Sequence, residues 1–388
     1  MKIRRNIILF KLDRFFGGLW PLSALAVVYF QQITGSYAFA MSVFGIGSII
    51  QSLSEMPANV VSDRAGRRTA LIISASLVLA SFIAFALAGN IGSGALLIFG
   101  GVMWGMARAF ANGTDDAIMY ETAKELGQEG KYDVIFARTN TWWQVGLAVA
   151  ALIAALVTYF YSLNVLAWVS AALAVIPVII AFEFVEPNIH RKSLANSWRH
   201  FVTAWKEFKK NKKLHNLAFA QVFHRGVGTT IHRIEGAYFN TLIPTWLVNI
   251  TRIIKQLAGA LSFVIAPHIR KLGFLKILMA SQLCVFLLRS VGLAINNFAT
   301  PFVMSFVNIF FGFTTTAQSA LLQKELSHEQ RATMGSFVSL LGGLAAALVF
   351  YIAGVIADAS SVYVAIIALT LCNLVSAGWY YKLLKRYQ

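Results

Sequence analysis

Charged residues are scarce in this chain of 388 residues. Asp, Glu, Lys and Arg make up 13% of it, whereas soluble domains have about a quarter. Acidic residues are especially few, 16 against 33 Lys and Arg, which gives a net charge of +17. Hydrophobic residues make up 58%, and the mean hydropathy is +0.67. This composition excludes a soluble globular protein and predicts a polytopic membrane protein.

The residues and motifs that redox centres, metal sites and nucleotide sites require are also scarce in this chain. There are two cysteines, Cys284 and Cys372, and both fall inside apolar runs. We interpret them as small buried side chains, so we expect no disulfide, metal site or cofactor. A phosphate-binding loop of the type G-x-x-x-x-G-K-[ST] is absent, so the chain does not use ATP directly. The basic residues lie in clusters that flank apolar runs, which argues against a nucleic-acid partner.

Long apolar runs are what the chain does have. A helix needs about 20 apolar residues to cross the hydrocarbon of a bilayer. We predict an all-α membrane protein with twelve such spans. They lie near residues 15–34, 38–61, 69–89, 92–115, 138–160, 163–184, 215–238, 242–266, 273–295, 299–323, 332–356 and 361–382.

The placement of Lys and Arg predicts the orientation, because basic residues favour the cytoplasmic side. Alternate loops carry nearly all of them, so we expect both termini in the cytoplasm and a multi-pass protein of the cytoplasmic (inner) membrane. The N-terminal run continues directly into another one, which favours an uncleaved first helix over a signal peptide. The predicted organisation is a bundle over 1–186, a cytoplasmic linker over 187–213, and a second bundle over 214–388.

The linker has aromatic residues at helical spacing, from Trp198 to Phe208, with lysines and arginines elsewhere around the helix. This pattern is typical of an amphipathic helix at an anionic membrane surface. A solvated linker whose positive charge only fixes the topology explains it equally well.

A charged knot between two apolar runs is the most specific motif. It consists of Asp63, Arg64, Gly66, Arg67 and Arg68. It resembles the loop between the second and third helices of the major facilitator superfamily, and departs from that pattern where Asn59 replaces a glycine.

The resemblance implies two six-helix bundles that work by alternating access. It also implies that Asp63 is a gate residue facing the N-terminus of the eleventh helix, around 333–336, where a carboxylate is favoured by the helix dipole. The alternative is that these charges only enforce topology.

A second segment, Gly113 to Glu121 at the end of the fourth span, resembles a Gly-Thr-x-Glu-Ala segment of efflux members of the same superfamily. Arg108 resembles an arginine of the fourth-helix motif at a slightly different spacing. An arginine in a span is costly, so we expect it to face a cavity or to pair with Asp115, Asp116 or Glu55. The fifth span lacks the Gly-Pro motif typical of drug antiporters.

The third signal is the polarity of the seventh to ninth spans. The seventh carries acidic, basic and amide side chains, of which Gln221, His224 and Glu235 share a face with Gly228. Cations exceed carboxylates, and each must face protein or water. This predicts a site for carboxylate or phosphate groups. The alternative is a set of pairs between helices. The predicted substrate-binding residues are Gln221, His224, Arg225, Arg252, Lys255 and Arg289.

The remaining predictions assign proton coupling and gating. Glu235, His232, Asp116 and Glu55 are the expected proton-coupling residues, because burial and neighbouring charges can bring such groups to titrate near neutral pH. The expected gate residues are Asp63, Arg64, Gly66, Arg67 and Arg108.

The predicted function is proton-coupled export of a small anionic or amphiphilic metabolite or drug by a secondary active transporter, not an enzyme. The expected partners are the solute, protons and membrane lipids, and we expect a monomer. An importer of an organic anion is the first alternative. A membrane enzyme or receptor is the second, which the sequence disfavours because no metal or catalytic cluster is evident.

Overall fold

The computed structural model describes residues 3–129, 132–187, 212–325 and 328–387. Within these residues the elements are helices, and they form two compact units. The first comprises Met1–Gly35 and Ile46–Leu194, and the second comprises Ser36–Gly45 and Ala195–Gln388. The predicted amphipathic helix of the linker lies outside the described residues.

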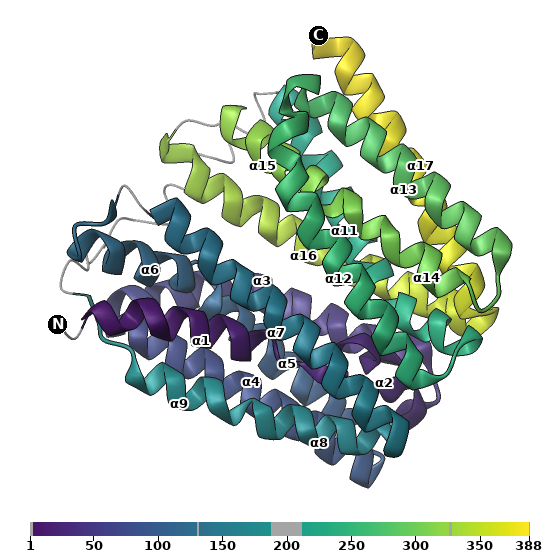
Figure 1. The fold of residues 1–388 in the computed structure, drawn as a ribbon, viewed down its shortest axis with the longest axis horizontal. Coiled ribbons are helices and arrows are strands. Elements are labelled where there is room, and N and C mark those ends of the chain that lie inside the picture. The colour runs from purple at the N-terminus through teal and green to yellow at the C-terminus, as the bar shows by residue number, and fades with distance from the viewer. Residues whose placement is uncertain (1–2, 130–131, 188–211, 326–327, 388) are drawn as a thin grey trace. The chain divides into compact units, whose positions relative to one another are not determined.

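The first half of the chain includes several interrupted spans (Figure 1). The predicted first span is broken: α1 ends at Gly18 and a 3₁₀ turn that begins at Pro21 precedes α2. Proline suits the first turn of a helix, where its missing N–H has no partner to lose. In order, the elements are α1 Asn6–Gly18, α2 Ala26–Thr34, α3 Tyr37–Ala65, α4 Arg67–Ile91, α5 Gly94–Ala111, α6 Thr114–Glu125, α7 Tyr132–Phe160, α8 Leu163–Leu173 and α9 Val175–Glu183.

The start of the first span differs from the prediction. Helix α1 begins at Asn6, well before residue 15, and therefore includes Asp13 and Arg14. The predicted span begins only after these two residues, because charged residues are usually excluded from membrane spans. In the structure they have partners on α6.

A break also occurs at the end of the fourth span. Helix α5 ends at Ala111, and α6 starts at Thr114 after Gly113, whose φ of 82° is left-handed. Glycine adopts that conformation without steric cost. The break puts Asp115 and Asp116 in the first turn of α6, where carboxylates are favoured by the helix dipole.

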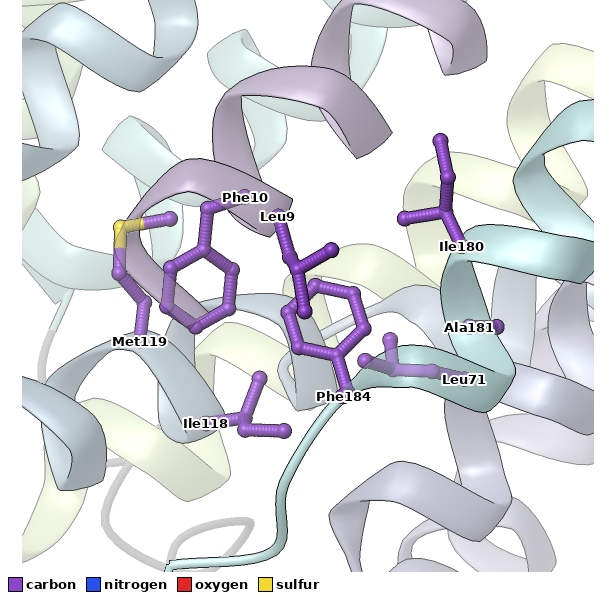
Figure 2. Packing of buried hydrophobic residues seen from close by; sticks show 8 residues of the cluster. All are labelled: Leu9, Phe10, Leu71, Ile118, Met119, Ile180, Ala181 and Phe184. Atoms are coloured by element: carbon purple, nitrogen blue, oxygen red, sulfur yellow. The ribbon is translucent and has the colours of Figure 1, made fainter. Parts of the chain in front are cut away.

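An apolar core joins α1, α4, α6 and α9 in the first unit (Figure 2). The rings of Phe10 in α1 and Phe184, which follows α9, lie 5.1 Å apart between centroids. Met119 and Ile118 of α6 pack against the same cluster. This core fixes α6 beside α1, and so brings the charges of the two helices together.

The second unit contains α11 Lys212–Leu242, α12 Thr245–Ile269, α13 Phe274–Ile295, α14 Thr300–Ser305, α15 Phe311–Glu325, α16 His328–Ala359 and α17 Val362–Tyr387. A 3₁₀ stretch, Phe306–Phe310, separates α14 from α15 within the predicted tenth span. A core of apolar side chains from α11, α13, α15 and α17 closes this unit, including Ala220, Leu278, Ala317 and Tyr380.

Among the described residues, eight helical stretches are long and apolar enough to cross a membrane. The count of twelve spans stays a prediction. Helix α11 is not among the eight; its middle carries Arg225, Arg233 and Glu235.

Candidate functional site

The turn between α11 and α12 sets an acid and a base side by side. Glu235 and Lys255 each lie about 10 to 15 Å from this turn, at 1.5 Å per residue. That depth is close to the middle of a hydrocarbon layer about 30 Å thick. Lys255 Nζ donates to both carboxylate oxygens of Glu235, at 2.7 and 2.9 Å. Both residues are buried, with exposed fractions of 6% for the lysine and 5% for the glutamate.

A second pair lies one helical turn away, between Arg252 and His232. Arg252 Nη2 lies 2.9 Å from His232 Nε2. A guanidinium keeps its proton and can only donate, so Nε2 must accept. His232 is therefore neutral in this arrangement, with its proton on Nδ1, and it balances none of the arginine's charge.

Arg289 of α13 adds a third cation. It interacts electrostatically with Glu235 and with both His224 and His232 of α11. We name Arg252, Lys255, Arg289 and Glu235 together the cationic cluster. These four residues carry three cations and one carboxylate. Such an excess is expensive in a low-dielectric interior unless an anion or water compensates it.

Residues in and beside the 3₁₀ stretch Phe306–Phe310 of the tenth span form hydrogen bonds with α12. Asn308 Nδ2 donates to the carbonyl of Lys255 at 2.8 Å, and Ser305 Oγ donates to that of Thr251 at 3.1 Å. Further along, the amide of Gly312 donates to Ser262 Oγ at 2.8 Å. Asn308 was not predicted from the sequence. Its signal was an amide side chain inside an otherwise apolar run.

The remaining predicted residues of α11 have different surroundings. The backbones of Gln221 and Arg225 lie in α11, but their side chains are outside the described residues. His224 lies beside Gln282 of α13. Arg233 instead lies over the ring of Phe44, with its guanidinium carbon 4.5 Å from the ring centroid.

In the first unit, Glu55 is a buried carboxylate beside the break of the fourth span. Asn112 Nδ2 donates to Glu55 Oε1 at 2.8 Å, and Gln51 donates to the same oxygen at 3.4 Å. Two amide side chains thus hold this carboxylate in place. Arg108 is exposed and interacts electrostatically with Asp115.

Arg14 is a close partner of Asp115 and Asp116. Its Nη2 lies 3.3 Å from Asp115 Oδ2 and 3.4 Å from Asp116 Oδ1. Asp13 interacts electrostatically with Asp115 and Arg14. Arg14 was not predicted from the sequence, because both charges of α1 fell outside the expected first span.

The charged knot forms a compact network within the first unit. Arg67 lies 3.0 Å from Asp63 and 3.6 Å from Glu121 of α6. It also donates to Ser62 Oγ, which lies 3.2 Å from Thr114 Oγ1. The knot thus ties the end of α3 to α6. Arg64 is exposed.

Glu186 was not predicted from the sequence. It caps α4, which begins at Arg67 within the knot. Its two carboxylate oxygens accept the backbone N–H groups of Arg67 and Arg68, each at 2.7 Å. Arg68 donates from its side chain to the carbonyl of Phe182 at 2.6 Å. The expected contact of Asp63 near 333–336 stays a prediction, because the side chains there lie outside the described residues. Asn59, the departure from the motif, is exposed.

Comparisons with known proteins agree with this architecture. The model of the Major Facilitator Superfamily matches residues 14–253. A search of curated protein sequences found no match. Among solved structures, the nucleoside transporter NupG is similar with a TM-score of 0.80 at 17% identity, covering 100% of both chains.

Two other solved structures have the same fold. A D-xylose–proton symporter has a TM-score of 0.73 at 14% identity, covering 98% of both chains. A bacterial homologue of the human lysosomal transporter Spinster has a TM-score of 0.74 at 12% identity, covering 98% of this chain and 97% of that one.

The fold and the family match therefore define a multi-pass membrane transporter. The chain belongs to the Major Facilitator Superfamily.

Proposed function

We propose that this chain transports a small organic anion, bound at the cationic cluster of α11, α12 and α13. The observation that carries the proposal is the charge balance of this cluster. Lys255 is neutralised by Glu235 through two short hydrogen bonds, whereas Arg252 is hydrogen-bonded to an uncharged imidazole. A carboxylate or phosphate would supply the missing charge, and arginine binds both through paired donors.

Proton coupling is the second part of the proposal, and Glu235 is its centre. An anion that binds Lys255 competes with Glu235 for the same ammonium group. A buried carboxylate that loses its cation is costly as an anion and takes up a proton. Substrate binding and protonation of Glu235 are therefore linked, so a proton gradient can drive the movement of the anion. His232 is the neighbouring titratable group, and it can accept a proton on Nε2 only after its hydrogen bond from Arg252 breaks.

Export is the third part. It is supported by the resemblance of the segment from Gly113 to Glu121 to a segment of efflux members. Because the anion and the proton bind together in this scheme, both move in the same direction, so export must be driven by the gradient of the anion itself. In inverted vesicles of the cytoplasmic membrane, an exporter then takes up labelled anion without an imposed pH gradient, and an acid interior opposes this uptake. Uptake that requires an acid interior would instead indicate exchange of anion for proton and contradict the proposed linkage.

The test of the substrate class uses proteoliposomes and a panel of labelled organic anions and organic cations. The wild type is expected to take up anions and not cations. Arg252→Gln should raise KM for the anion at least about tenfold, since it removes a charge-assisted contact. Lys382→Gln, an exposed lysine of the same unit, is the matched control and should match the wild type. Uptake of cations alone, or anion uptake that Arg252→Gln leaves unchanged, contradicts the proposal.

A further inference from the structure

Helix α11 has an open position among its buried polar residues. Gly228 lies one turn after His224 and one turn before His232, so the three positions follow one side of the helix. A Cβ atom built on Gly228 has no atom of the described residues within 4 Å. Gly226 gives the contrast, because its Cβ would lie 3.6 Å from the backbone of Ala345 in α16. Among the described residues, one side of α11 is therefore packed, and the side of Gly228 is open.

The two ends of this open stretch differ in chemistry. At one end, His232 is joined to Arg252, close to the Lys255–Glu235 pair. At the other end, His224 lies beside Gln282. Arg289 interacts with both ends, and the other three members of the cationic cluster lie at the His232 end.

The His224 end has unused hydrogen-bonding capacity. His224 Nδ1 and Gln282 Oε1 are both buried and have no hydrogen-bond partner among the described residues. Buried polar atoms in native proteins are nearly always hydrogen-bonded. One atom is a ring nitrogen and the other a carbonyl oxygen, so a hydroxyl or amide group, which both donates and accepts, would satisfy this end.

We propose that Gly228 forms the floor of the substrate site, and that the substrate is an elongated organic anion with a hydroxyl or amide group remote from its charge. Its anionic group binds at Arg252 and Lys255, and its neutral polar group binds His224 and Gln282. The two ends are separated by about 12 Å along α11, at 1.5 Å per residue. This inference rests on the proposed function and adds the length and polarity of the substrate.

The first test fills the open position. Gly228→Leu adds a side chain where the structure has space, so the variant should fold, as purification and thermal unfolding would show. Its KM for an α,ω-hydroxycarboxylate should rise at least tenfold, whereas inhibition by acetate, which needs only the anionic end, should not change. Gly378→Leu is the matched control: it lies on exposed α17 surface, and its Cβ also meets no described atom within 4 Å. It should behave as the wild type.

Gly228→Ala keeps the test decisive if the leucine variant does not fold. The smaller side chain should still raise KM for the α,ω-hydroxycarboxylate, in proportion to the space it takes. An unchanged KM in a folded Gly228→Leu protein, or in Gly228→Ala when the leucine variant does not fold, overturns the proposal.

The second test concerns the polar end. The wild type should prefer the α,ω-hydroxycarboxylate to the alkyl carboxylate of the same chain length by at least about tenfold, because an unpaired polar site rejects an analogue that lacks the hydroxyl. His224→Leu should abolish that preference. If the preference is absent in the wild type or survives in His224→Leu, the inference fails. If Arg252→Gln leaves anion uptake unchanged, the proposed function fails instead, whatever the Gly228 variants do.

Discussion

Lys255 Nζ lies 2.7 and 2.9 Å from the two carboxylate oxygens of Glu235, and both residues are buried. Each residue belongs to a different helix, and the short turn at Pro244 brings them to the same depth. The two charges compensate each other, so the charge of Arg252 and Arg289 remains in excess within the cationic cluster.

Removing one partner of this pair should destabilise the protein more than removing both. Glu235→Gln takes the carboxylate away from a buried ammonium, and breaking a buried pair typically costs about 3–5 kcal/mol. The double variant Glu235→Gln with Lys255→Gln removes both charges and should recover part of that loss. The stabilities of Glu235→Gln, Lys255→Gln and the double variant are measured by thermal unfolding of the purified proteins in detergent. Additive losses in the double variant would show that the two residues are not coupled.

Asn308 should hold Lys255 in position beside Glu235, through its hydrogen bond to the backbone of α12. Asn308→Leu removes the hydrogen bond to the carbonyl of Lys255, a contact worth about 1 kcal/mol. Transport should slow more than this small loss of stability explains, because the position of Lys255 also shifts. Ser42→Ala, which removes a hydroxyl that donates to the carbonyl of Ala38 in the same unit, serves as the comparison. Equal transport rates in the two variants would argue against a positioning role.

Glu186 should contribute to stability through its cap on α4. Glu186→Gln weakens two charge-assisted bonds to the amides of Arg67 and Arg68, so a loss of about 1 kcal/mol is expected. Glu183→Gln is the control, because Glu183 pairs with Arg5 on the surface, and surface pairs contribute little. Unfolding temperatures of the two variants provide the measurement. A larger effect at Glu183 than at Glu186 would refute the capping role.

Arg14 should stabilise the first unit, although it lies near the start of the chain. Arg14→Gln removes the cation that lies beside Asp115 and Asp116, so the two carboxylates and Asp13 repel one another more strongly. We expect a loss of about 1–3 kcal/mol, measured by thermal unfolding. Arg4→Gln changes an exposed arginine and should have little effect. If the two variants unfold alike, the contacts of Arg14 are energetically unimportant.

Much of the fold follows from the sequence, because apolar runs and Lys and Arg placement are local signals. The charged knot indicates the family from the sequence alone, since Asp63 and Arg67 lie close together along the chain. Pairs between helices could not be predicted, because they depend on how the helices pack. The partners Glu235 and Lys255 depend on the register across a turn, and Arg14 with Asp115 depends on the packing of α1 against α6.

Other features were hidden for specific physical reasons. The broken first span was not predicted, because the apolar pattern continues through Pro21 and gives no sign of the interruption. The cap on α4 involves Glu186, far along the chain from Arg67, so no spacing rule connects them. The open position at Gly228 is visible only when neighbouring side chains are placed.

The most direct measurement of the central claim is accumulation of a labelled organic anion in proteoliposomes with and without an imposed pH gradient, for the wild type and Glu235→Gln. We predict that the gradient drives accumulation in the wild type. We also predict that Glu235→Gln still exchanges anion across the membrane but no longer responds to the gradient. Gradient-driven accumulation in Glu235→Gln equal to that of the wild type would contradict the proposed coupling.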